Sequence, residues 1–309
     1  MTGFSSFIDI KIIFIIFIIG ASITTFLCLF IILLIIFTKH LHSPSNLLLC
    51  NTSMVIILYL ITIIIKISLW YNGSTYNNSW CRILAYLDDV FLHTIYYSIV
   101  IQALSRLFLI VFNTHRHLLE YKFHIILIIL QNLISFLLPL PILVTENVIF
   151  ISFLMCYVPY TKILHKVYSF VSTYFVPLFI IIIVYGIIYC RVIRSSTTSQ
   201  QPSRAHRRDL ELIRNILILF AFFIIAAFPF LIVFAVQLTT EFQSRVFYLS
   251  PLLIAPVLGI TERICLIYLN KEIRRETKKL LGQLHPIHPS NQVTVFASPT
   301  THAPNMEIH

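Results

Sequence analysis

The residues best placed for chemistry in this sequence are ionisable side chains that stand inside long apolar stretches. They are Asp88, Asp89, Arg106, Glu262 and Arg263. A charged group in apolar surroundings is costly, so it persists where it binds a ligand, carries ions or protons, or pairs with an opposite charge. These residue types therefore indicate ligand or ion binding and buried ion pairs.

Other kinds of chemistry have little support in the sequence. It shows no nucleophile–base pair, phosphate-binding loop or metal-ligand cluster, and its twelve histidines are scattered without paired spacing on a helix face. We therefore expect that the chain is not an enzyme and that it uses no cofactor and no metal.

The composition describes the surroundings of these charges. Of 309 residues, 58% are hydrophobic and 11% are charged, whereas soluble domains have about 45–50% apolar and about 25% charged residues. The net charge of +10 raises the alternative of nucleic-acid binding, but the Lys and Arg residues stand mostly in short loops between apolar runs. We therefore expect a membrane protein with no nucleic-acid partner.

Long apolar windows divide most of the chain into candidate membrane spans, each able to cross a hydrocarbon core of about 30 Å. The windows are 12–38, 46–70, 82–113, 123–144, 166–192, 211–238 and 247–269. They predict an all-α membrane protein, a seven-transmembrane helix bundle over residues 12–269. The apolar run Val148–Val158 is too short to span, and we expect it in an outer loop.

Three further segments flank the bundle. Residues 1–11 are expected to form a short extracellular N-terminus. Residues 270–284 combine apolar and basic side chains, which is typical of an amphipathic cytoplasmic helix that contacts membrane lipids. Residues 285–309 are rich in Pro, His, Ser and Thr and are expected to form a disordered cytoplasmic tail.

Basic residues predict the orientation. Fifteen Lys and Arg residues stand on one side of the seven windows and six on the other, and the positive-inside rule places the richer side in the cytoplasm. The N-terminus is then extracellular, as is the loop with glycosylation sequons at Asn72 and Asn77. We predict a multi-pass protein of the plasma membrane.

Several spacings within the windows match a known pattern. Cys81 precedes Arg106 by 25 residues, Pro177 precedes Tyr185 by eight, and Asp209 precedes Pro229 by twenty. With Asn46 and Asn51 in the second window, these residues resemble four of the helices of rhodopsin-like (class A) G-protein-coupled receptors. The resemblance extends over residues 10–284.

This resemblance implies a receptor that binds an extracellular ligand and activates a heterotrimeric G protein when helix six moves. It further implies a disulfide between Cys81 and Cys156, an inner lock and G-protein contact formed by Arg106, Asp209 and Tyr185, and hinges at Pro229 and Pro177.

The sequence departs from the family pattern at several switch positions. Ser105 and Leu107 replace the acid and the tyrosine beside the family's helix-three arginine, and Ile56 stands where a helix-two acid is expected. Ala227 replaces the helix-six tryptophan, and the helix-seven Asn-Pro-x-x-Tyr motif is absent. We therefore expect a divergent member that retains the fold.

Asp88, Asp89 and Tyr96 are candidates for the ligand pocket. Asp88 occupies the interval at which the family's amine receptors carry an aspartate, so the resemblance favours an amine there. The alternative is that the acids lie near a water-filled mouth and pair with Arg82 or Lys66.

The ligand would be a small molecule or a short peptide, and the alternative function is a channel or transporter. We expect acids only at the two ends of the bundle, which leaves the middle apolar and favours a receptor.

Glu262 and Arg263 are adjacent near the inner end of the last window. Neighbours on a helix point about 100° apart, so we expect each charge to need its own partner. One interpretation is a polar network that replaces the missing helix-seven motif, and the other is contact between Arg263 and lipid phosphates.

Overall fold

The structure is a computed structural model that describes residues 2–71, 78–112, 114–145, 149–151, 155–157, 163–198 and 245–284, with single residues between 218 and 236. The helices are α1 (Thr2–Phe37), α2 (Pro44–Tyr71), α3 (Asn78–Val111), α4 (Tyr121–Leu137), α5 (Leu140–Val144), α6 (Ile163–Phe170), α7 (Val176–Thr198), α9 (Arg245–Leu269) and α10 (Lys271–Leu284). Asn72, Asn77, Asp209, Pro229 and the tail 285–309 lie outside the described residues.

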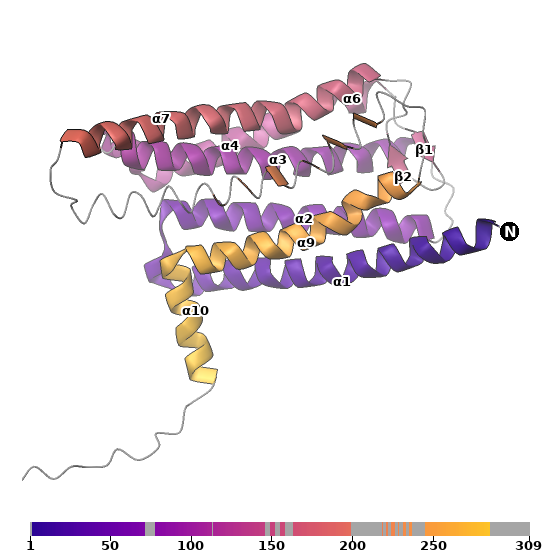
Figure 1. Cartoon of the computed structure of the whole chain (residues 1–309), viewed down its shortest axis with the longest axis horizontal. Helices are drawn as coiled ribbons and strands as arrows, with labels where there is room; N and C mark the ends of the chain where they lie inside the picture. The colour runs from indigo at the N-terminus through magenta and orange to yellow at the C-terminus, as the bar shows by residue number, and fades with distance from the viewer. Residues whose placement is uncertain are drawn as a thin grey trace, which may run out of the picture.

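Long apolar helices that run side by side make up most of the described chain (Figure 1). Four of them are long and apolar enough to cross a membrane, namely Lys11–Phe37, Pro44–Leu69, Ser79–Val111 and Ile163–Arg191. The bent pair α9 and α10 adds a fifth if it is counted as one span. α4 is apolar but shorter, and the expected span 211–238 has only scattered described residues. The helical membrane bundle is confirmed, and its count of seven stays a prediction.

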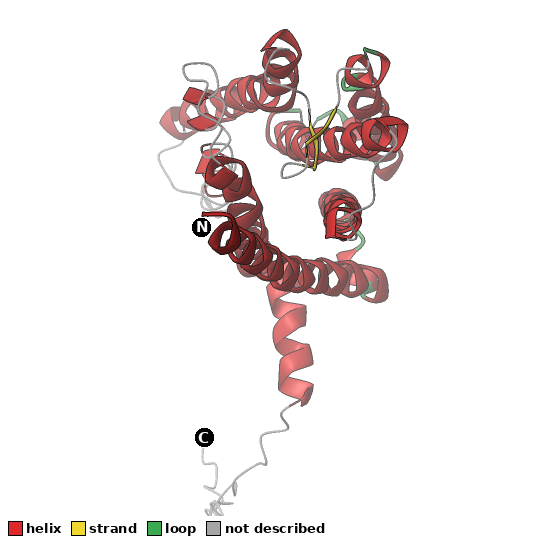
Figure 2. Ribbon diagram, turned by 90° about the vertical axis from the view of Figure 1, so that its right-hand side faces the viewer, coloured by secondary structure: helices red, strands yellow, loops and turns green. Residues whose placement is uncertain are grey.

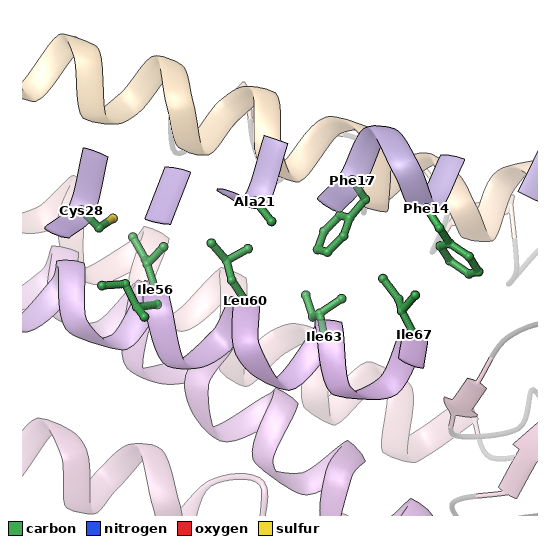
Figure 3. Close-up of a cluster of buried hydrophobic side chains, with 9 residues drawn as sticks. Phe14, Phe17, Ala21, Cys28, Ile56, Leu60, Ile63 and Ile67 are labelled. Atoms are coloured by element: carbon green, nitrogen blue, oxygen red, sulfur yellow. The ribbon is translucent and has the colours of Figure 1, made fainter. Parts of the chain in front are cut away.

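The seam between α1 and α2 shows how the helices hold together (Figure 3). Phe14, Phe17, Ala21 and Cys28 of α1 point toward Ile56, Leu60, Ile63 and Ile67 of α2. Spacings of three, four and seven residues place each set on one face of its helix. Because lipid is as apolar as these side chains, close packing stabilises the seam more than exclusion of water does.

α1 also crosses α9 closely, and small residues make the crossing possible. A Cβ atom added at Gly20 would lie 2.6 Å from Cβ of Pro256, and one added at Gly259 would lie 3.1 Å from Cγ2 of Thr24. A side chain at Gly20 would therefore force a shift of α1 or α9, and one at Gly259 would require the side chain of Thr24 to give way by a few tenths of an ångström. This crossing places the inner half of α9 beside both α1 and α2.

Prolines interrupt the regular α-helix in two of the expected spans. α4 ends at Leu137 and the short α5 follows Pro139, so the window 123–144 is not one helix. In the fifth window a π-helical segment, η3 (Val171–Phe175), separates α6 from α7. Pro177 is the second residue of α7, one position beyond η3. Its nitrogen has no hydrogen to donate to the carbonyl of Thr173 and its ring crowds that carbonyl, and one wider turn relieves that conflict.

The segment expected as a loop between the fourth and fifth windows contains a short hairpin, which leaves the all-α fold class intact. Between α5 and α6 the chain forms a two-stranded antiparallel sheet of β1 (Ile149–Ile151) and β2 (Met155–Tyr157), in which Phe150 stands opposite Cys156. The strands fall within the apolar run Val148–Val158, which is rich in the β-branched and aromatic residues that favour strands. Figure 1 shows them at the same end of the bundle as the N-terminus.

α10 leaves the other end of the bundle at a sharp angle (Figures 1 and 2). It bends by 93° from α9 at Asn270. The Asn270 side-chain oxygen accepts hydrogen bonds from the backbone N–H groups of Glu272 and Ile273, and its amide nitrogen donates to Asn46 at 3.1 Å. Asn270 therefore caps α10 and ties its start to α2.

Candidate functional site

One candidate site lies where α2 and α3 meet. We call it the outer site because it lies at the end of the bundle that the sequence predicts to be extracellular, and we call the opposite end the inner end. Nζ of Lys66 lies 2.7 Å from Oδ2 of Asp88, with the Lys66 side chain 8% exposed and that of Asp88 30% exposed. Of the two interpretations of Asp88, the structure favours the ion pair with Lys66 over a free acid. Arg82, the other cation considered, donates instead to the backbone carbonyl of Leu143.

One turn further along α3, His93 is fully buried and joins α3 to the π-helical segment. Its Nδ1 lies 2.7 Å from the carbonyl oxygen of Asp89, so Nδ1 carries the proton and donates it. Nε2 then accepts from the hydroxyl of Thr173 at 3.1 Å and lies 3.0 Å from that of Ser172. The wider turn of η3 thus brings two neighbouring hydroxyls to one imidazole.

Aromatic rings form the inner boundary of this site. Tyr96 of α3 and Tyr174 of η3 are buried with ring centroids 4.7 Å apart, and Phe170 joins the same cluster. Tyr59 of α2 lies within electrostatic range of Asp88, Asp89 and Tyr96. The predicted pocket residues Asp88, Asp89 and Tyr96 therefore belong to one neighbourhood.

The middle of the bundle contains neutral polar groups, although we expected it to be apolar. The hydroxyl of Thr52 lies 2.9 Å from that of Ser98, and the amide of Gln102 donates to Thr52 at 2.9 Å. The amide of Gln131 donates to the carbonyl of Thr94. These bonds link α2, α3 and α4 through neutral donors and acceptors, as is common between membrane helices, although Oε1 of Gln131 has no hydrogen-bond partner in the described part of the chain.

Arg106 lies near the inner end of α3, and its neighbours differ from those of the family pattern. Ser105, which replaces the expected acid, bonds Nε2 of His124 in α4 at 2.9 Å, and Nδ1 of His124 bonds the carbonyl of Glu120 at 3.0 Å. Arg106 interacts electrostatically with Tyr185 of α7. Among the described residues no carboxylate forms an ion pair with Arg106.

The expectation that Glu262 and Arg263 do not meet was wrong. Nη2 of Arg263 lies 2.8 Å from Oε1 of Glu262, and Nη1 donates to the hydroxyl of Ser53 at 3.2 Å. Long side chains can close the angle between neighbouring positions, which backbone geometry alone does not reveal. Arg263 is 0% exposed, so it belongs to a buried polar network and does not reach lipid phosphates.

The remaining predicted residues are only partly placed. Cys81 is buried near the start of α3 and is disulfide-bonded, and α3 contacts β2, the strand that holds Cys156. Pro177 is buried at the second position of α7, one residue beyond η3. Thr173 was missed, since a single buried polar residue in an apolar helix gives no periodic signal.

Comparison with known families decides between the receptor and the other membrane proteins considered. The family model of the 7 transmembrane receptor (rhodopsin family) matches residues 27–262. The chain belongs to this family. Its members are receptors rather than enzymes, and the match covers the outer site, the inner end of α3 and Glu262. No curated protein matches the chain.

Proposed function

We propose that this rhodopsin-family chain binds an extracellular ligand at the outer ends of its helices and activates a heterotrimeric G protein at their inner ends. The observation that carries the proposal is the layout of α3. Asp88 and Arg106 lie on this one helix, and their separation of 18 residues amounts to about 27 Å along the axis at 1.5 Å per residue. A ligand and a G protein could therefore bind the same rigid element.

Several features support an orientation with the N-terminus outside, at the plasma membrane. We pair Cys81 with Cys156, because β2 lies against α3 and an outer hairpin meets an oxidising compartment. Asn72 and Asn77 would then carry glycans. α10 would lie along the inner surface with its basic side chains toward anionic lipid headgroups.

Activation would proceed by a shift between two populations. A ligand that binds the open-inside state more tightly favours that state by the difference in its two binding free energies. Helix six, hinged near Pro229, would move outward and free Arg106 for the G protein, with Asp209 as its partner at rest. Pro177 and η3 would supply a second flexible point beside the ligand site.

The test is expression at the cell surface with second-messenger and current recordings, screened over amines, peptides and lipids. We expect ligand-dependent second-messenger signals that Arg106→Ala abolishes at unchanged surface expression. Ligand-gated currents that persist in Arg106→Ala would instead show a channel.

A further inference from the structure

Only one of the two carboxylate oxygens of Asp88 has a hydrogen-bonding partner. Lys66 holds Oδ2, whereas Oδ1 is buried and has no hydrogen-bond partner within the described part of the chain. A buried carboxylate oxygen without a partner is a favourable acceptor for a group from water or from a ligand. Oδ1 is an acceptor, so such a group is a hydrogen-bond donor.

The charge at this site limits which donor fits. The Lys66 ammonium already occupies the position of a cation beside Asp88 and is held between α2 and α3 with 8% of its side chain exposed. A second cation would meet the ammonium of Lys66 as a like charge, and an anion would meet the carboxylate of Asp88 as one. A hydroxyl or amide N–H group meets neither repulsion.

The rest of the neighbourhood suits an apolar body. Tyr96 and Tyr174 are 7% and 6% exposed and form an aromatic cluster with Phe170. Sites for small ligands combine such apolar walls with a few polar groups that fix orientation.

We propose that the outer site takes a neutral ligand whose hydroxyl or amide donates a hydrogen bond to Oδ1 of Asp88 and whose aromatic or apolar body faces Tyr96 and Tyr174. Lys66 supplies the positive charge that an amine ligand would otherwise bring. This inference rests on the proposed function only in placing the ligand at the outer end of the bundle.

Four matched probes test it: 2-phenylethanol, its methyl ether, 2-phenylethylammonium and phenylacetate. They share one aromatic body and differ in offering a neutral donor, no donor, a cation or an anion. Binding to the full chain in lipid nanodiscs is measured by saturation-transfer NMR. We expect the alcohol to bind about tenfold more tightly than each of the others, the discrimination that one buried hydrogen bond can supply.

The variant Lys66→Met gives a sharper test than probe binding to the unaltered chain. It leaves the charge of Asp88 uncovered, so the preference should change from the alcohol to the ammonium probe. Lys11→Met is the matched control, because Lys11 stands on α1 with its ammonium over the ring of Tyr71, and should keep the alcohol preference. Lys66→Met with Asp88→Met removes both charges, leaves no unpaired ion to destabilise the fold, and should bind the alcohol and its ether equally.

Three results would overturn the proposal. They are tighter binding of the ammonium probe by the unaltered chain, equal binding of the alcohol and its ether, and an alcohol preference that survives in the double variant. Equal binding would mean that Oδ1 holds only water. None of these measurements involves a G protein, so failure here leaves the coupling proposal standing, and loss of coupling leaves the binding result standing.

Discussion

At the scale of single residues, the inner end of α3 combines a retained arginine with altered neighbours. Ser105 bonds His124 and so anchors α3 to α4, whereas a carboxylate at that position would neutralise Arg106. Tyr185 lies within electrostatic range of Arg106. A neutral phenol compensates the charge of a guanidinium less than a carboxylate does.

The lock between Arg106 and Asp209 gives the first prediction. Asp209→Ala should raise basal signalling a few-fold, because exposed ion pairs contribute about 0–1 kcal/mol and partly buried pairs contribute more. Arg106→Asp with Asp209→Arg should restore the quiet state but not signalling. The measurement is second-messenger output at matched surface expression, and unchanged output of Asp209→Ala in a coupling receptor would contradict the lock.

The partly buried ion pair of Glu262 and Arg263 gives the second prediction. Glu262→Gln should lower the melting temperature of the purified protein, because it leaves the buried guanidinium of Arg263 without its opposite charge. Adding Arg263→Met should recover part of the loss, since no lone charge then remains. A double variant less stable than Glu262→Gln would show that Arg263 stabilises the fold through Ser53 instead.

Residue spacing predicted the protein family, but it did not predict which charged side chains of this chain pair with one another. The 25 residues between Cys81 and Arg106 are fixed by one continuous helix, so they can be read from the sequence. The contact of Lys66 with Asp88 depends on how α2 faces α3, and sequence left it as one of two options. The bond between Glu262 and Arg263 depends on side-chain reach, which helical spacing does not encode.

At the scale of elements, helix interiors were easier to predict than their interruptions. Apolar windows locate α1, α2 and α3 because a span of lipid needs one long apolar run. Pro139 and Pro177 stand in the expected windows, but sequence does not say whether a proline ends a helix or widens a turn. The β1–β2 hairpin was missed because strands of three residues give almost no periodic signal.

The outer hairpin gives the third prediction. If Cys81 and Cys156 are bonded, Cys81→Ser and Cys156→Ser should reduce folded surface protein to the same degree, because each loses a constraint worth a few kcal/mol, about 2–5 kcal/mol in small domains. The double variant should match either single one, as measured with a conformation-sensitive tag and surface labelling. Additive losses would mean that the two thiols are not joined to each other.

The Asn270 cap at the start of α10 gives the fourth prediction. Asn270→Ala should loosen the first turn of α10, since loss of a capping side chain costs about 1 kcal/mol, and hydrogen exchange of the amides of Glu272 and Ile273 should speed up. Asn270→Asp keeps the oxygen acceptor but loses the amide donor to Asn46, so it should restore slow exchange there. Equal exchange in the Ala and Asp variants would argue against capping.

At the scale of the whole molecule, the two ends of the bundle carry different structural elements. Figure 1 shows the N-terminus and the hairpin at one end and α10 at the other. The start of α3, with Cys81 and Asp88, belongs to the hairpin end, since α3 contacts both strands. Arg106 and the capped start of α10 belong to the opposite end. The proposed ligand-binding end and the proposed coupling end are therefore separated by the length of α3.

This polarity gives the last prediction, which concerns topology. Fifteen of the Lys and Arg residues stand on the α10 side of the predicted spans and six on the N-terminal side, so the α10 end should face the cytoplasm. A tag before Thr2 should react with antibody on intact cells, and a tag after His309 only once the cells are permeabilised. Two tags accessible from the same side would contradict an odd number of spans. Reversed labelling would place Asp88 in the cytoplasm and Arg106 outside, and would defeat the receptor proposal.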